Sequence, residues 1–118
     1  MYPLKFEPYL REMVWGGEKI APFKGIKTKQ HNIGESWEIS AVPGCVSVVS
    51  NGTFAGKSLT EVMNEYGPEL VGKKVFAKTG TEFPLLIKFI DAKSDLSIQV
   101  HPNDELAART HPGMKGKT

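Results

Sequence analysis

The chain has 118 residues, a length that suits one modest domain with a buried core and is short for an enzyme with a large substrate cleft. Its 15 basic and 13 acidic residues give a formal charge of +2, which offers no electrostatic reason to expect a nucleic acid or a membrane surface as partner. A single cysteine, Cys45, excludes an internal disulfide bond, and no stretch approaches the roughly 20 apolar residues of a membrane span. We therefore expect a cytoplasmic protein with no nucleic-acid or membrane partner.

Glycine and proline interrupt the sequence often, and the runs between them are rich in Val, Ile, Phe and Thr, which favours a mostly β structure. Early in the chain, Trp15 precedes two glycines and has two readings: a buried anchor beside a turn, or an aromatic wall for a sugar ring. The segments ESWEISAV (35–42) and CVSVVS (45–50) predict two strands of a hairpin, with a Pro-Gly turn between them. Glu35 and Glu38 would point to opposite faces of the first strand, so they cannot act as a paired acid and base.

One or two short helices are expected. Ser58 and Glu61 have the spacing of a capping box, and apolar residues follow at helical intervals until Gly67-Pro68 predicts the end of the helix. A second short helix is expected over residues 103–109, with Asn103 as its N-cap.

Two further strands are predicted over residues 83–92 and 94–102, paired antiparallel through a turn at residues 93–95. Alternate side chains of a strand point to opposite faces, so the second strand has one apolar face and one polar face. The polar face carries a hydroxyl, an amide and an imidazole but no full charge, which is unusual for a solvated strand. We therefore expect it to line a cavity. The apolar face consists of Leu96, Ile98 and Val100, and the polar face consists of Ser97, Gln99 and His101.

Gln99 and His101 are two residues apart, and side chains at this spacing on a strand can reach the same metal ion. Zinc accepts imidazole nitrogen readily and side-chain oxygen less tightly, but it needs three or four ligands. The alternative is that His101 is a hydrogen-bonded histidine at a strand end and Gln99 an amide on the sheet surface. The spacing by itself leaves both readings open.

Lys88 lies between Leu86 and Ile90 on one face of an otherwise apolar strand, where an ammonium group needs either water or an anion. If the two predicted strands pair, Lys88 and Ser97 share one side of the sheet and together suit a phosphate or a carboxylate. The alternative is that Lys88 extends its charge into solvent at a sheet edge.

Four motifs, VWGG, GESWEIS, FPLLIKFIDAKSDLSIQVHPND and GKT, occur in this order along the chain. In this order they resemble the class I mannose-6-phosphate isomerases, also called phosphomannose isomerases, over essentially the whole chain. The resemblance implies a cupin-like β-jelly-roll fold, a zinc cofactor, and the interconversion of mannose 6-phosphate and fructose 6-phosphate. Family members are roughly two to three times this length, so residues 1–118 are expected to be the truncated N-terminal part of a catalytic domain.

The resemblance also implies roles for individual residues. It makes Gln99 and His101 two of the metal ligands, and it gives Lys88 and Ser97 contacts with the substrate phosphate. Lys117 corresponds to a polar active-site lysine, which we take as the catalytic candidate. The substrate pocket is further expected to include Trp15 and Glu35.

In the family, the remaining metal ligands and an active-site arginine follow the part that this chain matches. The isomerase activity is therefore expected of the full-length protein, and the 118-residue chain alone is expected to be inactive. The alternative is a non-catalytic, cupin-like module that binds or senses a sugar phosphate. Sheet edges left uncovered in such a piece would favour self-association.

Overall fold

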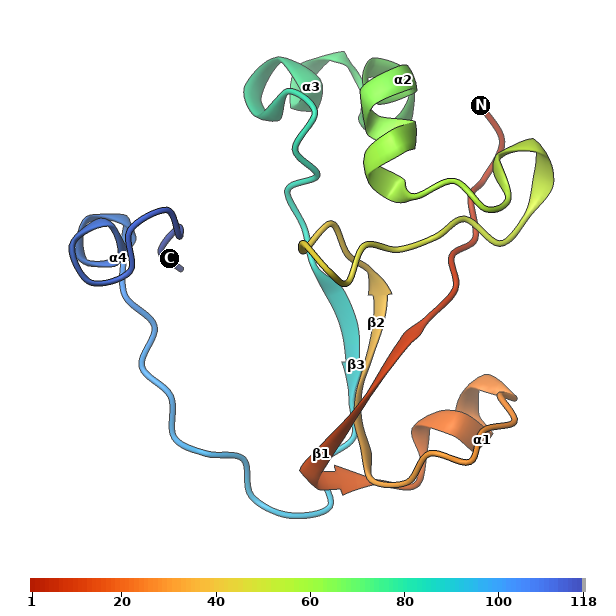
Figure 1. Ribbon diagram of the computed structural model, residues 1–118, viewed down its shortest axis with the longest axis vertical. Coiled ribbons are helices and arrows are strands. Elements are labelled where there is room, and N and C mark those ends of the chain that lie inside the picture. The colour runs from red at the N-terminus through yellow and green to blue at the C-terminus, as the bar shows by residue number, and fades with distance from the viewer. Residues whose placement is uncertain (118) are drawn as a thin grey trace.

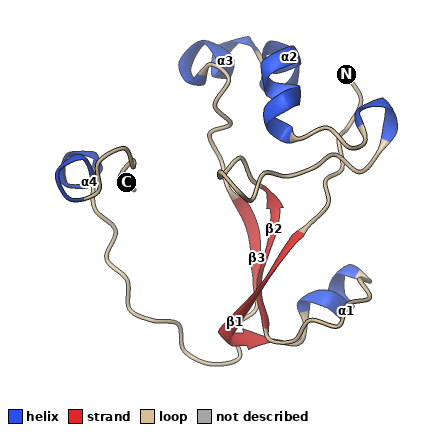
Figure 2. Ribbon diagram, viewed as in Figure 1, coloured by secondary structure: helices blue, strands red, loops and turns tan. Residues whose placement is uncertain are grey.

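The computed structural model describes residues 1–117, which contain a three-stranded antiparallel sheet and four α-helices (Figures 1 and 2). The strands follow the order β1-β2-β3, so β2 is central and β3 forms one edge of the sheet within the described chain. No helix among these residues has the length and apolar character needed to cross a membrane. The strands are β1 (Tyr9–Gly17), β2 (Ile33–Ile39) and β3 (Ile87–Ile90).

The described residues contain four α-helices, whereas the sequence predicted one or two. Two, α2 and α4, match the predictions, whereas α1 and α3 were not expected. Neither of these has a side chain that caps its first turn, so neither carries the local pattern that usually marks a helix start. The helices are α1 (Ile20–Lys24), α2 (Leu59–Val71), α3 (Lys73–Thr79) and α4 (Asp104–Thr110), and a short 3₁₀ turn covers Gly52–Phe54.

Helix α2 begins as predicted. The Ser58 hydroxyl accepts a hydrogen bond from the Glu61 backbone N–H at 3.2 Å, and the Glu61 carboxylate accepts one from the Ser58 N–H at 2.7 Å. The predicted end at Gly67-Pro68 is wrong, because the helix kinks at Tyr66 and continues to Val71. Pro68 is tolerated there because its missing N–H falls in the first turn after the kink, where no intrahelical partner is required.

The largest fully buried apolar side chains belong to α2 and to the segment before it. Leu59, Val62 and Met63 of α2 are buried, as is Val49. Backbone bonds join these two parts of the chain: the Leu59 N–H donates to Ser47 O at 2.8 Å, and the segment pairs again at Val49. These buried side chains form a small core that lies beside the three-stranded sheet.

The predicted hairpin over residues 35–50 forms only in part. The turn is present, since the Cys45 N–H donates to Val42 O at 2.9 Å and the Ser47 N–H donates to Ser40 O at 2.8 Å. Its first strand is β2, which ends at Ile39, and its second is reduced to single bridges instead of a continuous strand. The bridges join Val48 to Ser58 and Phe6 to Val49.

The prediction of a strand over residues 94–102, paired with residues 83–92, is wrong in this structure. The edge strand β3 pairs with β2 instead, and the chain after it runs away from the sheet to α4 (Figure 1). One cause is visible at the turn, where the N–H groups of Lys93 and Ser94 donate to Trp15 O at 2.8 and 3.3 Å. These bonds attach the chain to β1, so it does not fold back along β3.

Candidate functional site

Glu35 on β2 and Lys88 on β3 meet on one face of the sheet although they are 53 residues apart in sequence. The Lys88 ammonium donates a hydrogen bond to Glu35 Oε1 at 2.8 Å. The Glu35 side chain is only 10% exposed, whereas the Lys88 side chain is 31% exposed. A carboxylate so far removed from water needs a charged or hydrogen-bonding partner. The structure thus joins two residues that the sequence had singled out separately.

Two further residues complete this group, which we call the Glu35 cluster: Arg11, Glu35, Trp37 and Lys88. The Trp37 indole N–H donates to Glu35 Oε2 at 2.8 Å, so each carboxylate oxygen has its own donor. The Arg11 guanidinium lies 3.8 Å from Glu35 Oε2 and 4.9 Å from the centre of the Trp37 ring. The Lys88 ammonium lies 5.9 Å from the same ring. Trp37 is therefore flanked by two cations, as expected for the negative face of an aromatic ring.

Strand register produces this cluster. Arg11 pairs with Glu35 across β1 and β2, and Lys88 pairs with Trp37 across β2 and β3. Residues two apart on β2 share a face, so both pairs lie on the same side of the sheet. Sequence reasoning missed Arg11 and Trp37. In the sequence ESW, Glu35 and Trp37 are two residues apart and therefore share a face of the strand, which could have indicated Trp37. Arg11 is revealed only by the pairing of β1 with β2.

Opposing effects act on the pKa of the Glu35 carboxyl. Burial raises the pKa, but hydrogen bonds from Lys88 and Trp37 lower it. The positive charges of Lys88 and Arg11 add to the lowering, and the net result is a pKa below the ordinary value. The carboxylate is therefore ionised at neutral pH.

The other acidic residue of this strand, Glu38, lies on the opposite face, as predicted. It accepts hydrogen bonds from the Lys24 ammonium at 2.5 Å and from the Ser36 hydroxyl at 2.7 Å. Lys24 belongs to α1, and Phe23 of that helix packs edge-on against Phe89 of β3. Helix α1 thus covers this face of the sheet and leaves the Glu35 cluster on the other.

Trp15 lies near the end of β1 and packs over Gly34. A Cβ atom at Gly34 would lie 2.7 Å from the Trp15 ring, so only glycine fits beneath it. The carbonyl of Trp15 also receives the backbone bonds that hold the chain after β3. These contacts support the reading of Trp15 as a packing anchor, and its contact with a sugar remains a prediction.

Ser97, Gln99 and His101 are exposed and lie in an extended segment outside the sheet. The Gln99 amide lies 3.4 Å from the Ser97 hydroxyl, which agrees with the expectation that these two side chains share one side of the segment. Their apolar neighbours are exposed as well, since Ile98 is 99% and Val100 is 92% exposed. The expected core face of this segment is therefore wrong, and so is the expected enclosure of Ser97 and Gln99 in a cavity. Both expectations depended on a neighbouring strand that residues 1–117 do not supply.

His101 and Lys117 come together at a separate place. Both line an open cavity of about 280 Å³ beside α4, which also includes His111. The loop that carries Lys117 is held by its own N–H, which donates to Pro102 O at 2.8 Å. Thr118, the last residue of the GKT motif, lies outside the described residues.

The described residues do not by themselves fit a zinc site. Gln99 and His101 are exposed, and no group of three or more His, Cys, Asp or Glu side chains within residues 1–117 is arranged to hold a metal. Zinc in proteins is held by three or four ligands. Zinc binding at Gln99 and His101 therefore requires ligands from outside the described chain.

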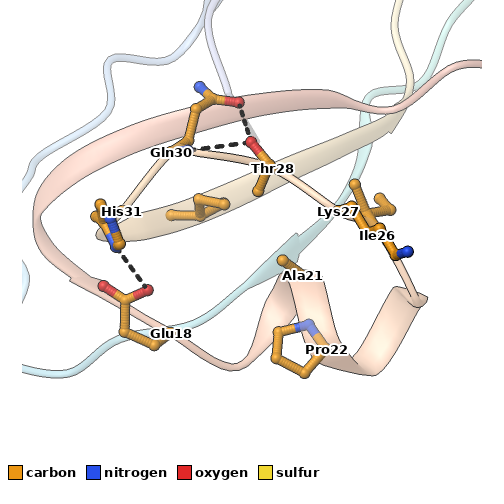
Figure 3. Close-up of a pocket in the computed structure, with 9 residues that line it drawn as sticks. Glu18, Ala21, Pro22, Ile26, Lys27, Thr28, Gln30 and His31 are labelled. Atoms are coloured by element: carbon orange, nitrogen blue, oxygen red, sulfur yellow. Dashed lines mark hydrogen bonds and ion pairs between the residues drawn. The ribbon is translucent and has the colours of Figure 1, made fainter.

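A third region, a cavity of about 390 Å³, lies between α1 and the chain that leads into β2. Figure 3 shows His31 facing Glu18 across its rim, with Ala21 and Pro22 of α1 at its base. The His31 Nδ1 atom lies 3.6 Å from Glu18 Oε2, and both side chains are largely exposed. None of the seven site residues predicted from the sequence lines this cavity.

Comparison with known proteins decides the family. A family model described as the catalytic domain of type I phosphomannose isomerase matches residues 4–115. The chain belongs to this family. Mannose-6-phosphate isomerase ManA of Bacillus subtilis is 42% identical over 116 residues, which cover 98% of this chain and 35% of that protein. The chain therefore spans about a third of the length of the curated relatives that it matches.

Solved structures of phosphomannose isomerases agree with this assignment. The crystal structure of the mannose 6-phosphate isomerase from Bacillus subtilis superimposes with a TM-score of 0.81 at 37% identity, covering 98% of this chain and 35% of that one. A zinc-bound mannose 6-phosphate isomerase superimposes with a TM-score of 0.74 at 27% identity, covering 90% of this chain and 27% of that one.

Proposed function

We propose that the protein to which this chain belongs interconverts mannose 6-phosphate and fructose 6-phosphate. In this reaction a proton moves between C1 and C2 through a cis-enediol. The observation that carries the proposal is the family match over residues 4–115. In this proposal Lys88 and Ser97 contact the substrate phosphate, and Lys117 serves in proton transfer. Trp15 and Glu35 form part of the substrate pocket.

The Glu35 cluster supports the phosphate assignment of Lys88. An ammonium group that is held by a buried carboxylate keeps a defined position, which reduces the conformational entropy lost when it binds an anion. Lys88 remains partly exposed, so a ligand can reach it. Lys88 thus combines a defined position with access from solvent.

We further propose that the 118 residues are part of a longer, cupin-like catalytic domain with a jelly-roll architecture, acting in the cytoplasm. The superposition on larger phosphomannose isomerases supports this, since the chain covers 35% of the Bacillus subtilis structure. Within the described residues, β3 has an unpaired edge, and the apolar side chains of residues 96–100 are exposed. Additional strands of a larger sheet would pair with this edge and cover these side chains.

Zinc is the proposed cofactor, with Gln99 and His101 as two of its ligands. The zinc-bound relative supports this choice of metal. When bound, zinc would stabilise negative charge on the substrate oxygens. The further ligands that it needs come from outside residues 1–117, so this chain alone is expected to hold zinc poorly.

The test is a coupled isomerase assay on the full-length protein, together with its zinc content. Gln99→Ala and His101→Ala are each expected to lower zinc content and to reduce activity by about 100-fold or more, because loss of a ligand disrupts the metal shell. His31→Ala is the matched control, since His31 is exposed and lies outside the proposed site. Normal activity and normal zinc content in both ligand variants would refute the assignment.

Gln99 and His101 are exposed, and residues 1–117 supply no complete set of ligands for zinc. This favours a second function for the isolated chain, namely sugar-phosphate binding without turnover. In that case mannose 6-phosphate raises the melting temperature of the 118-residue chain while the isomerase assay stays negative. If the full-length protein also binds mannose 6-phosphate without isomerising it, the binding module replaces the enzyme as the conclusion.

A further inference from the structure

The charges of the Glu35 cluster leave one cation uncompensated. The Lys88 ammonium and the Glu35 carboxylate form a close pair at 2.8 Å, which is neutral overall. A phosphate monoester carries between one and a half and two negative charges near neutral pH, by analogy with phosphorylated side chains. A neutral pair attracts such a dianion only weakly. A phosphate site at Lys88 therefore needs a further positive charge nearby.

Arg11 provides that charge on the same face of the sheet. Its guanidinium lies 3.8 Å from Glu35 Oε2, which is longer than a hydrogen bond and leaves its N–H donors available. The side chain is 41% exposed, so these donors can reach a ligand. Arginine remains charged at all relevant pH values and presents a planar set of donors that matches phosphate oxygens.

Trp37 orients this guanidinium. The Arg11 guanidinium carbon lies 4.9 Å from the ring centre, and the ring is itself held by the bond from its N–H to Glu35. Stacking on a fixed ring limits the positions of a long side chain, so less entropy is lost when a ligand binds. Arg11 and Lys88 approach the same carboxylate from β1 and β3, one on each side of the central strand.

We propose that Arg11 is a second cationic contact for the phosphate monoester of the substrate, next to Lys88 and held in place by Trp37. The proposal rests on the proposed function, because it assigns the phosphate-binding part of the same site. It makes Arg11 a determinant of specificity for phosphorylated over neutral sugars. It assigns Arg11 no part in proton transfer.

The experiment compares wild type with Arg11→Met in the full-length protein. The variant is expected to raise the KM for mannose 6-phosphate at least tenfold while kcat changes less than twofold, because hydrogen bonds to charged groups are worth about a factor of ten or more. Inorganic phosphate, used as a competitive inhibitor, is expected to lose affinity by a similar factor. The control is Lys74→Met, which removes one positive charge from α3 and is expected to change neither value.

An unchanged KM and an unchanged inhibition constant for phosphate in Arg11→Met would overturn the proposal while the isomerase function stands. A wild-type protein without isomerase activity would refute the proposed function. Calorimetric titration of that same protein with inorganic phosphate would still test Arg11, because equal affinities of wild type and Arg11→Met for phosphate would overturn its role.

If Arg11→Met does not fold, Arg11→Lys keeps the charge but loses the planar donors. It is expected to raise KM at least threefold, and an unchanged KM would count against the proposal.

Discussion

Glu35 is the residue on which the candidate site depends. It is almost fully buried, yet it stays ionised because Lys88 and Trp37 each bind one of its oxygens. Two donors and a nearby guanidinium compensate for the loss of water, which otherwise makes a buried carboxylate costly. The buried charge thus connects all three strands of the sheet through Arg11, Glu35 and Lys88.

Glu35→Gln is expected to destabilise the chain by about 1–2 kcal/mol at pH 7, because an amide cannot replace the charge that faces Lys88. The pKa of Glu35 is lower in the folded chain than its ordinary value of 4.5, so its stabilising contribution is present above that pH. The contribution is lost as the pH falls below 4.5 through the folded pKa. Chemical denaturation of both proteins at several pH values measures this. A difference in unfolding free energy that stays constant between pH 7 and pH 3 would contradict the expectation.

Among the elements, α2 shows how far a local pattern can be trusted. Its first turn is closed by reciprocal bonds between Ser58 and Glu61, and this contact needs no information from the rest of the fold. Its far end depends on context, because the helix resumes after Tyr66. Asn103 caps α4 in the same local way, through a bond of 2.9 Å from the Leu106 N–H to its side chain.

Ser58→Ala removes the N-cap acceptor of α2 and is expected to reduce stability by about 1 kcal/mol. The effect follows from an unsatisfied N–H at Glu61 in the first turn of the helix that supplies most of the small core. Thermal unfolding followed by circular dichroism measures the loss. Thr60→Ala, at an exposed position of the same turn, is the control and is expected to have little effect. Equal melting temperatures for wild type and Ser58→Ala would show that the cap does not stabilise the helix.

At the scale of the whole molecule, the described chain is open. Its radius of gyration is 16.4 Å, compared with about 13–14 Å for a compact domain of this length. The excess comes from the segment after β3, which carries α4 away from the sheet (Figure 1). Ile98 and Val100 are exposed on this segment, and β3 has an unpaired edge within the described residues.

The isolated 118-residue chain is therefore expected to self-associate as its concentration rises. Apolar side chains and an open strand edge favour pairing between copies. Ile98→Lys combined with Val100→Lys is expected to shift the sedimentation profile toward monomer. Thr53→Lys, at another exposed position, is expected to leave the association unchanged. A wild-type chain that remains monomeric at every concentration would contradict this prediction.

The sequence by itself determined the features that depend on neighbouring residues and on recognisable motifs. These include the start of α2, the cap of α4, the opposite orientations of Glu35 and Glu38, and the family to which the chain belongs. Helix caps and strand alternation arise from contacts only a few residues apart, so the sequence contains enough information to predict them.

Only the tertiary structure decided which distant side chains meet. Arg11, Glu35 and Lys88 come together because three strands pair in one particular register, and no local pattern specifies that register. The same reason explains why the predicted strand over residues 94–102 is absent. A strand needs a neighbouring strand that exchanges hydrogen bonds with it. Here the N–H groups of Lys93 and Ser94 bond to the carbonyl of Trp15, and within the described residues no strand pairs with the chain that follows.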